Sequence, residues 1–415
     1  MVTVTVIGAG VAGCTTGYLL SERGYDVTIL EKGEIGGLLR EIEFDSGYHC
    51  DSAPHLLFYD PEEEAVVGDL FRRFTDLDDH TFYAKTYPKG TLDEPHNYPV
   101  TRSNISLWDD ADEIEKELAT AEGKTDADYF EPYMRRQVGE RLYNRYYKNY
   151  TNKHWGIDPT RITGDWFDFK ISFPDTEDSF FDGAAKYPQK KYSTVLTEMV
   201  EDCNVVYDGA TGFETAGSEI EAVTTESGEV ISSDIFVSTI DPSLLVDTDN
   251  SLQYRSMAIL GAHIEASERL FPEHVSWGYF PNDYEFTRIT DYDFTPQDIP
   301  NGEYILTVEF PCFIEDDIWA RSTEWFEEYL LSFLEEQGVE ATVKDAKVRR
   351  APRAYPLPVE SEIETFNEMN NRLNAYENMF NLGRVSTYEY IWIKDIVQQA
   401  HDTVDELTAA TPLQS

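Results

Sequence analysis

The chain has 415 residues and carries 79 Asp and Glu against 33 Lys and Arg, a formal net charge of −46. Such an acidic protein is not expected to bind nucleic acid or anionic membrane surfaces, because both ligands need positive charge. Hydrophobic residues make up 41% of the chain, enough for a core, and the length allows two or three domains. The acidic residues are spread over the whole sequence. This pattern favours adaptation to high salt, with an ordinary solvated surface as the alternative.

Neither a metal site nor a membrane segment is expected. The four cysteines form no CxxC pair, so the sequence predicts no metal site and no disulfide framework: Cys14, Cys50, Cys203 and Cys312. No apolar run approaches the roughly 18 residues of a membrane span. A strand is predicted to begin at Val2, which leaves no room for a signal peptide. We therefore expect a cytoplasmic protein that is not inserted in a membrane.

The first 31 residues predict a strand, a glycine turn, a helix and a second strand. The strand, the helix and the second strand are assigned to residues 2–7, 14–23 and 25–31. The turn carries the motif GxGxxG at Gly8, Gly10 and Gly13. Glu31 follows Gly13 by 18 residues and is placed to accept hydrogen bonds from ribose hydroxyls. In this context the motif predicts a dinucleotide site, with the pyrophosphate at the helix N-terminus.

The predicted cofactor is FAD rather than NAD. A glycine pair, Gly36 and Gly37, follows Glu31 closely. An acidic residue followed by such a pair is typical of FAD-binding proteins of the glutathione-reductase and amine-oxidase type. The alternative interpretation of the pair is an ordinary glycine-rich turn.

The rest of the chain predicts that other domains interrupt the first one. We predict an α/β protein with a discontinuous Rossmann-like FAD-binding domain, an inserted helical domain and an antiparallel β-sheet domain. The FAD-binding domain is assigned residues 1–80, 195–245 and 350–415. The helical domain is assigned residues 100–165. The sheet domain, which contributes to the substrate site, is assigned residues 81–99, 166–194 and 246–349.

A basic and aromatic segment stands out in this acidic chain. Residues 147–156 read YKNYTNKHWG and contain no acidic residue. The basic and aromatic residues of this segment are Tyr147, Lys148, Tyr150, Lys153, His154 and Trp155. We hypothesise that the segment forms a wall of a pocket for a planar, negatively charged ligand. Taken singly, each aromatic residue has a simpler interpretation as part of a core.

Four stretches together resemble the UDP-galactopyranose mutase family. They are GAGVAG at residues 8–13 with Glu31, DSAPHLLF at 51–58, QVGERLYNRYYKNYTNKHWGIDP at 137–159 and LGRVSTYEY at 382–390. FTRITDYDF and AYPLPVE also fall in the family's order, so the resemblance spans nearly the whole chain. It implies interconversion of UDP-galactopyranose and UDP-galactofuranose by reduced FAD, whose N5 is a covalent nucleophile at the anomeric carbon. By analogy with the family, it also implies a homodimer.

The resemblance assigns roles to individual residues. His55 is placed under the flavin, and the closing helix from Ile393 directs its positive end at the flavin ring. Tyr150 is expected to stack on the uracil, and Trp155 to border the sugar. The residues assigned to the diphosphate are Arg288, Arg384, Tyr355 and Tyr390.

These assignments define three sets of predicted site residues. The predicted catalytic residues are His55, Arg288 and Arg384. The predicted cofactor site comprises Gly8, Gly10, Gly13, Glu31, Gly36, Gly37, His55, Gly383 and Ile393. The predicted substrate site comprises Tyr150, Thr151, Trp155, Lys170, Phe180, Arg288, Tyr355, Arg384 and Tyr390.

The sequence departs from the family's pattern at several positions. Phe58 stands at the family's second histidine, Phe180 at a substrate-binding tyrosine, Gly278 at an expected asparagine and Trp392 at an acidic residue. An arginine of a mobile loop has no clear match, and Lys170 is the nearest cation. Three alternatives therefore stay open: a mutase for another sugar nucleotide, an FAD-dependent oxidoreductase of the amine-oxidase or desaturase type, and a non-catalytic binding protein.

Overall fold

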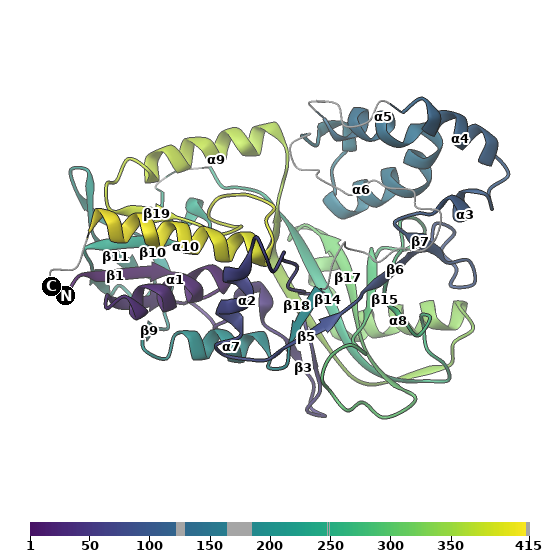
Figure 1. The fold of residues 1–415 in the computed structure, drawn as a ribbon, viewed down its shortest axis with the longest axis horizontal. Coiled ribbons are helices and arrows are strands. Elements are labelled where there is room, and N and C mark those ends of the chain that lie inside the picture. Colours follow the sequence, from purple (N-terminus) through teal and green to yellow (C-terminus); the bar gives the residue numbers. More distant parts are fainter. Residues whose placement is uncertain (122–128, 164–184, 247, 249, 412–415) are drawn as a thin grey trace.

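The structure is a computed structural model that describes residues 1–121, 129–163, 185–246, 248 and 250–411. Figure 1 shows three regions: a dinucleotide-binding half that contains both chain ends, a helical region, and a large sheet with one long helix. The helical region lies over one end of the large sheet.

A parallel five-stranded sheet forms the centre of the dinucleotide-binding half. The strand order is β19-β13-β1-β2-β9, and every neighbouring pair is parallel. The strands are β1 (Thr3–Ile7), β2 (Asp26–Leu30), β9 (Asn204–Val206), β13 (Ile235–Ser238) and β19 (Met379–Asn381). These strands come from distant parts of the chain. This confirms the predicted discontinuous Rossmann-like domain.

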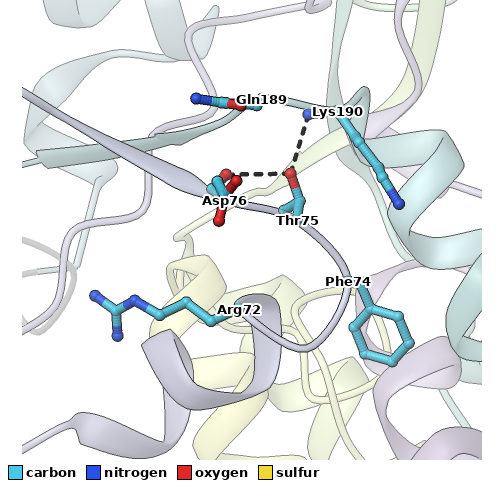
Figure 2. Close-up of a pocket in the computed structure, with 6 residues that line it drawn as sticks. All are labelled: Arg72, Phe74, Thr75, Asp76, Gln189 and Lys190. Carbon is cyan, nitrogen blue, oxygen red and sulfur yellow. Dashed lines mark hydrogen bonds between the residues drawn. The ribbon is translucent and has the colours of Figure 1, made fainter.

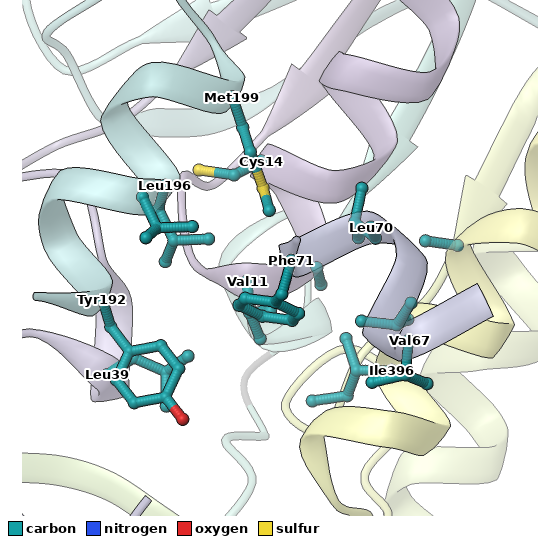
Figure 3. Close-up of a cluster of buried hydrophobic side chains, with 14 of the residues drawn as sticks. Val11, Cys14, Leu39, Val67, Leu70, Phe71, Tyr192, Leu196, Met199 and Ile396 are labelled. Carbon is teal, nitrogen blue, oxygen red and sulfur yellow. The ribbon is translucent and has the colours of Figure 1, made fainter. Parts of the chain in front are cut away.

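Four helices cover this sheet and enclose its apolar core. They are α1 (Val11–Glu22), α2 (Ala65–Phe71), α7 (Tyr192–Met199) and α10 (Ile393–Ala410). Figure 3 shows one labelled side chain from each helix in a shared cluster, namely Val11, Phe71, Leu196 and Ile396. Burial of this apolar surface is the main force that holds the helices on the sheet. α1 begins three residues before the predicted start, because the helix starts inside the glycine motif with Gly10 as its N-cap.

A seven-stranded sheet forms the second domain, in the order β18-β14-β17-β16-β15-β6-β7. The strands are β6 (Tyr83–Thr86), β7 (His96–Tyr98), β14 (Tyr254–Ala266), β15 (Val275–Tyr279), β16 (Arg288–Asp291), β17 (Glu303–Cys312) and β18 (Ala341–Pro356). Neighbours are antiparallel except for β15 and β6. α8 (Thr323–Glu336) packs on one face. Residues 350–356, assigned above to the FAD-binding domain, belong to this sheet because β18 pairs with β14 along nearly its whole length.

The helical region contains α3 (Arg102–Ile105), α4 (Ala111–Ala119), α5 (Phe130–Leu142) and α6 (Lys148–Trp155). A π-helical turn at Tyr143–Tyr147 joins α5 to α6, and such turns are frequent at functional sites. α6 ends at Gly156, whose φ of 68° lies in the left-handed region that glycine adopts readily. α6 contacts β17, and Figure 1 shows it on the side of the helical region that faces the sheet.

Smaller elements join these regions. Short ladders pair β3 (Ile42–Glu43) with β4 (His49–Cys50), and β5 (Leu77–His80) with β8 (Ala185–Pro188). A separate three-stranded sheet contains β10 (Ala210–Ala216), β11 (Glu219–Thr225) and β12 (Val230–Ser232). α9 (Glu360–Leu373) follows β18. Within the described ranges, no helix combines the length and the apolar character needed to cross a membrane.

Candidate active site

The first glycine turn connects β1 to α1 and leaves no room for side chains. A Cβ atom on Gly13 would lie 1.8 Å from the carbonyl oxygen of Gly8, so only glycine fits there. Gly8 has a φ of 104°, which also favours glycine. Glu31 accepts hydrogen bonds from the backbone nitrogens of Ala9 and Gly33, each at 2.8 Å. The turn therefore holds the start of α1 beside the carboxylate of Glu31, as the predicted dinucleotide site requires.

Two further turns converge on the N-terminus of α1. A Cβ atom on Gly37 would lie 3.0 Å from the Cα of Gly10, so the two backbones are in contact. A Cβ atom on Gly383 would lie 2.8 Å from the Cβ of Ala12. Three turns thus meet around one helix terminus, whose free N–H groups favour an anion. The predicted cofactor residues in these turns are Gly8, Gly10, Gly13, Gly36, Gly37 and Gly383.

His55 lies in a buried loop near these turns, and its carbonyl oxygen accepts a hydrogen bond from the Tyr192 hydroxyl at 2.7 Å. Burial, together with the positive charges of Arg349, Arg384 and Arg288, lowers the pKa of His55 to about 3. The imidazole is therefore neutral near pH 7. Three guanidinium groups thus act on one neutral ring.

Buried polar atoms around Arg349 indicate that a ligand belongs here. His55 Nδ1, Arg349 Nη1, Glu41 Oε2 and Asp51 Oδ2 have no hydrogen-bond partner within the described part of the chain. Leaving such an atom unpaired costs about 1–3 kcal/mol. Arg349 also donates to the carbonyl oxygen of Gly37 in the second glycine turn. The set offers both donors and acceptors, which fits a cofactor with phosphate oxygens, hydroxyls and a polar ring edge.

A row of aromatic rings runs from the helical region to the loop after β19. Tyr150 stacks on His154 with ring centroids 5.6 Å apart, and it meets Tyr279 edge-on at 5.7 Å. His154 lies 5.0 Å from Tyr355, and Tyr355 lies 5.6 Å from Tyr390. The row therefore crosses from α6 over β15 and β18 to the dinucleotide-binding half. It brings together three predicted substrate residues that are far apart in sequence.

The remaining predicted substrate residues have different positions. Trp155 is buried at the end of α6, with its ring 5.8 Å from that of Tyr355. Thr151 is buried one turn earlier on the same helix. Lys170 and Phe180 lie outside the described residues.

The two predicted arginines differ in how their charges are compensated. Arg288 on β16 makes a bidentate pair with Glu309 on β17, at 2.8 and 3.0 Å. Arg384 forms no ion pair with any described carboxylate. It donates to the carbonyl oxygen of Ile391 at 2.6 and 3.1 Å and lies 5.1 Å from the centre of the Tyr390 ring. Arg384 therefore keeps an uncompensated charge beside the aromatic row, whereas the charge of Arg288 is balanced.

The basic residues of the 147–156 segment do not form a cationic wall. The ammonium of Lys153 donates to backbone carbonyl oxygens of residues 280–286. Lys148 is exposed. Burial lowers the pKa of His154 to about 3, so its ring is neutral. The hypothesis of an aromatic wall agrees with the ring contacts, but the hypothesis of a basic wall is wrong for Lys153, whose charge is taken up by the protein itself.

Three of the departures from the family's pattern can be placed. Phe58 and Trp392 contact each other, with ring centroids 5.5 Å apart, at the start of α10. Gly278 on β15 faces the apolar core, because a Cβ atom there would lie 2.7 Å from the Tyr87 ring and 2.8 Å from the Phe271 ring. An asparagine would not fit at this position without a shift. The difference at residue 278 therefore reflects packing.

A surface pocket lies apart from these residues. It has a volume of about 310 Å³ and is lined by Arg72, Phe74, Thr75, Asp76, Gln189 and Lys190, as Figure 2 shows. None of the predicted site residues lines it. Within the described ranges, no group of three or more His, Cys, Asp or Glu could hold a metal ion.

Comparison with known proteins shows which family the middle of the chain matches. Residues 145–337, which include α6 and Arg288, match a family model described as UDP-galactopyranose mutase. Residues 6–74 match a model described as an NAD(P)-binding Rossmann-like domain. The fold matches a crystal structure of reduced UDP-galactopyranose mutase with a TM-score of 0.82 at 18% identity, over 100% of this chain and 97% of that one. The chain is therefore similar to the UDP-galactopyranose mutase family in the sequence of residues 145–337 and in its overall fold.

Relatives within and beyond this family differ in their named substrates. A dTDP-fucopyranose mutase of Escherichia coli is 22% identical over 96% of both chains. A probable UDP-galactopyranose mutase of Klebsiella pneumoniae is 25% identical over 38% of this chain and 42% of that protein. Putrescine oxidase bound to putrescine shares the fold with a TM-score of 0.61 and 12% identity, over 98% and 99% of the chains. The fold alone thus does not separate mutases from oxidases.

Sequence reasoning missed several members of the site. They are Tyr98, Tyr279, Glu309 and Arg349. Arg349 and Arg350 are adjacent on β18, and strand alternation indicates that only one of them faces the glycine turns. The sequence does not say which one, because that depends on the pairing register of β18 with β14.

Proposed function

We propose that the protein is an FAD-dependent mutase that interconverts the pyranose and furanose rings of a nucleoside diphosphate sugar, with UDP-galactose as the first candidate. The main supporting observation is the uncompensated charge of Arg384, which is adjacent to Gly383 in the glycine turns and to Tyr390 in the aromatic row. A sugar nucleotide places an anionic diphosphate between a planar base and a sugar. One free guanidinium beside a row of rings suits such a ligand.

FAD is the proposed cofactor. It is supported by the three glycine turns and by atoms of His55 and Arg349 that have no hydrogen-bond partner in the described part of the chain. When bound and reduced, FAD supplies a nucleophilic nitrogen for the anomeric carbon of the sugar. The N-terminus of α10 at Ile393 carries a partial positive charge, which favours a negatively charged group there. His55 can make one further hydrogen bond at Nδ1 without adding charge.

The side chains in and around the aromatic row have separate roles in this proposal. Arg384 holds the diphosphate while the bond to the sugar breaks and forms again, because a guanidinium keeps its charge at every working pH. Tyr150, stacked on His154, offers a flat surface for the base. Trp155 and Tyr355 form an aromatic wall that excludes water from the sugar. The Arg288–Glu309 pair stiffens the sheet behind this wall.

A second candidate is a mutase for a dTDP-linked sugar. Similarity to the Escherichia coli dTDP-fucopyranose mutase over 96% of both chains favours it. Uridine and thymidine nucleotides carry the same diphosphate and similar pyrimidine rings. Both bases can stack on Tyr150, so the aromatic row does not distinguish uridine from thymidine nucleotides. Contacts with the base edge, the pentose and the sugar must therefore set the specificity.

An anaerobic assay tests the proposal. Protein reduced with dithionite is mixed with UDP-galactofuranose or with dTDP-fucopyranose, and the ring isomers are separated by chromatography. We expect reduced protein to isomerise one of these substrates and oxidised protein to isomerise neither. Equal turnover in both redox states would exclude a nucleophilic flavin. Failure with both substrates, combined with oxidation of an amine, would favour the oxidoreductase alternative.

A further inference from the structure

The ammonium of Lys153 is surrounded by backbone carbonyl oxygens of the loop between β15 and β16. The distances from Nζ are 2.5 Å to the oxygen of Phe280, 2.7 Å to that of Tyr284, 2.8 Å to that of Phe286 and 3.3 Å to that of Asn282. Four oxygens from alternate residues thus converge on one cation. We call these four oxygens the carbonyl cage.

The carbonyl cage is the immediate environment of this charge. Lys153 forms no ion pair with any described carboxylate, and Asp283 acts on it only from a distance. Burial lowers the pKa of Lys153 to about 7. Carbonyl dipoles that replace a cation's hydration shell are the principle of potassium-selective filters. The cage has the same chemistry, with a lysine ammonium as its cation.

A second cation holds the same helix at its C-terminal end. Arg255 on β14 donates to the carbonyl oxygens of His154 and Lys153, at 2.8 and 2.9 Å. These carbonyls lie at the C-terminal end of α6, where they lack helical partners and where positive charge is favourable. The same guanidinium donates to the carbonyl oxygen of Pro311 at 2.9 Å, which ties it to β17. α6 is therefore clamped to the sheet by Arg255 and by the carbonyl cage.

The position of α6 sets the geometry of the aromatic row. Tyr150 and Trp155 are carried by α6, whereas Tyr279 precedes the 280–286 loop and Tyr355 belongs to β18. Lys153 lies between Tyr150 and Trp155 on the helix. Movement of α6 relative to the loop would therefore change the gap between rings from different domains.

We propose that Lys153 is a positioning residue: its ammonium occupies a cation site in the carbonyl cage and fixes α6, with Tyr150 and Trp155, against the seven-stranded sheet. The measurement of UDP affinity rests on the proposed function, but the cation site itself does not.

The proposal predicts different behaviour for the variants Lys153→Ala and Lys153→Met. Alanine leaves the cage intact and opens the space that the lysine filled. Ammonium and potassium ions are close in size to a lysine ammonium, so either can enter the cage, whereas tetramethylammonium is too large. Methionine keeps the length of the side chain but fills that space with apolar atoms. Cations are therefore expected to rescue the alanine variant alone.

Two measurements on the full-length flavin-loaded protein test this. UDP affinity is measured by calorimetry, and amide hydrogen exchange is measured over residues 148–156 and 280–286. Both are compared in ammonium, potassium and tetramethylammonium chloride at equal ionic strength, because screening of the large negative charge is then constant. The exposed Lys116→Ala on α4 is the control for loss of one positive charge in the same region.

We expect Lys153→Ala in tetramethylammonium chloride to bind UDP on the order of tenfold more weakly than wild type and to exchange faster in both segments. Ammonium or potassium chloride should restore both properties. Lys153→Met should show the same defects in all three salts, and Lys116→Ala should match wild type.

Three outcomes would overturn the proposal. The first is that Lys153→Ala binds UDP as tightly as wild type in tetramethylammonium chloride, and the second is that all salts rescue both variants equally. The third is that neither variant folds, which would make Lys153 a residue of the fold alone. If wild type does not bind UDP, the proposed function fails. Cation-specific protection of residues 280–286 in Lys153→Ala still tests the cage in that case.

Discussion

Backbone forms the cofactor side of the candidate site, whereas side chains from distant elements form the sugar-nucleotide side. Around the N-terminus of α1, three glycine turns touch one another so closely that a single Cβ atom would collide. Along the aromatic row, residues of α6, β15, β18 and the loop after β19 meet through ring contacts of 5–6 Å. The first side is rigid in shape, and the second depends on the relative placement of three domains.

The two sides also differ in the partners of their charged and polar side chains. Beside the glycine turns, Arg349 and His55 have buried polar atoms that find no partner among the residues that the structure describes. Near the row, Glu309 balances the charge of Arg288, and the carbonyl cage surrounds that of Lys153. Arg384 has no carboxylate partner among the described residues. In this strongly acidic protein, a few cations are thus available to bind ligands, whereas others hold the domains together.

The largest expected effect is on the cofactor side. Gly13→Ala would place a Cβ atom 1.8 Å from the oxygen of Gly8, which the turn cannot accommodate. We expect this variant to lose bound flavin completely, as measured by visible absorbance after gentle purification. Gly212→Ala on β10 is the control, because its Cβ atom would be 3.5 Å from the nearest atom. Normal flavin content in Gly13→Ala would contradict the rigid-backbone view.

Arg288→Ala is expected to act mainly on stability. It leaves the carboxylate of Glu309 buried without its partner, and breaking a buried pair in this way costs about 3–5 kcal/mol. Urea unfolding should show this loss. The double variant Arg288→Ala with Glu309→Gln should recover part of it, because the buried charge is then removed. If Arg288→Ala is as stable as wild type but binds UDP weakly, Arg288 is a ligand for the diphosphate instead.

Arg384→Ala is expected to act mainly on nucleotide binding. A charge-assisted hydrogen bond is worth about 1.5–3 kcal/mol, so UDP affinity should fall about 10- to 100-fold. Arg384→Lys should restore only part of the affinity, because the charge returns without the guanidinium fork. Calorimetric titration of variants with verified flavin content measures this. Unchanged UDP affinity in both variants would remove the main support for a sugar-nucleotide site.

The neutral histidines predict acid sensitivity. Burial lowers the pKa of His154 to about 3, below its value of about 6.5 in the unfolded chain. As the pH falls below about 6.5, the unfolded chain binds a proton that the folded protein does not, so stability is lost down to about pH 3. Between about pH 7 and pH 5 this amounts to at most about 2 kcal/mol. Urea titrations of wild type and His154→Gln at both pH values should differ by this amount, and identical pH profiles would contradict it.

The effect of salt on stability is expected to be the same for the cofactor side and the sugar-nucleotide side. Raising KCl from about 0.1 M to about 1 M shortens the Debye length from about 10 Å to about 3 Å and screens the net charge of −46. The melting temperature should rise by several degrees in wild type and in Arg384→Ala equally. A melting temperature that is independent of salt would contradict adaptation to high salt, which is so far a prediction from composition.

The sequence predicted the cofactor side more completely than the sugar-nucleotide side. Gly8, Gly10, Gly13 and Glu31 lie within one βαβ unit, so a local motif specifies their arrangement. The roles of Tyr150, Arg384 and Tyr390 could be assigned only through resemblance to a family, because nothing local brings the three residues together. Arg349 was missed for the same reason. The sequence also could not show why Gly278 stands where an asparagine is expected, because that depends on its position in an apolar core.

The sequence by itself determined the dinucleotide motif, the interrupted domain and the abundance of aromatic residues on α6. These follow from backbone sterics and apolar periodicity, which act over a few residues. Only the tertiary structure decided which cations are free. Arg288, Lys153 and Arg384 look alike in the sequence. In the structure Arg288 meets a carboxylate, Lys153 meets four carbonyl oxygens, and Arg384 meets aromatic rings and the carbonyl oxygens of two residues. The partners come from other domains, and electrostatic balance depends on distance in space rather than along the chain.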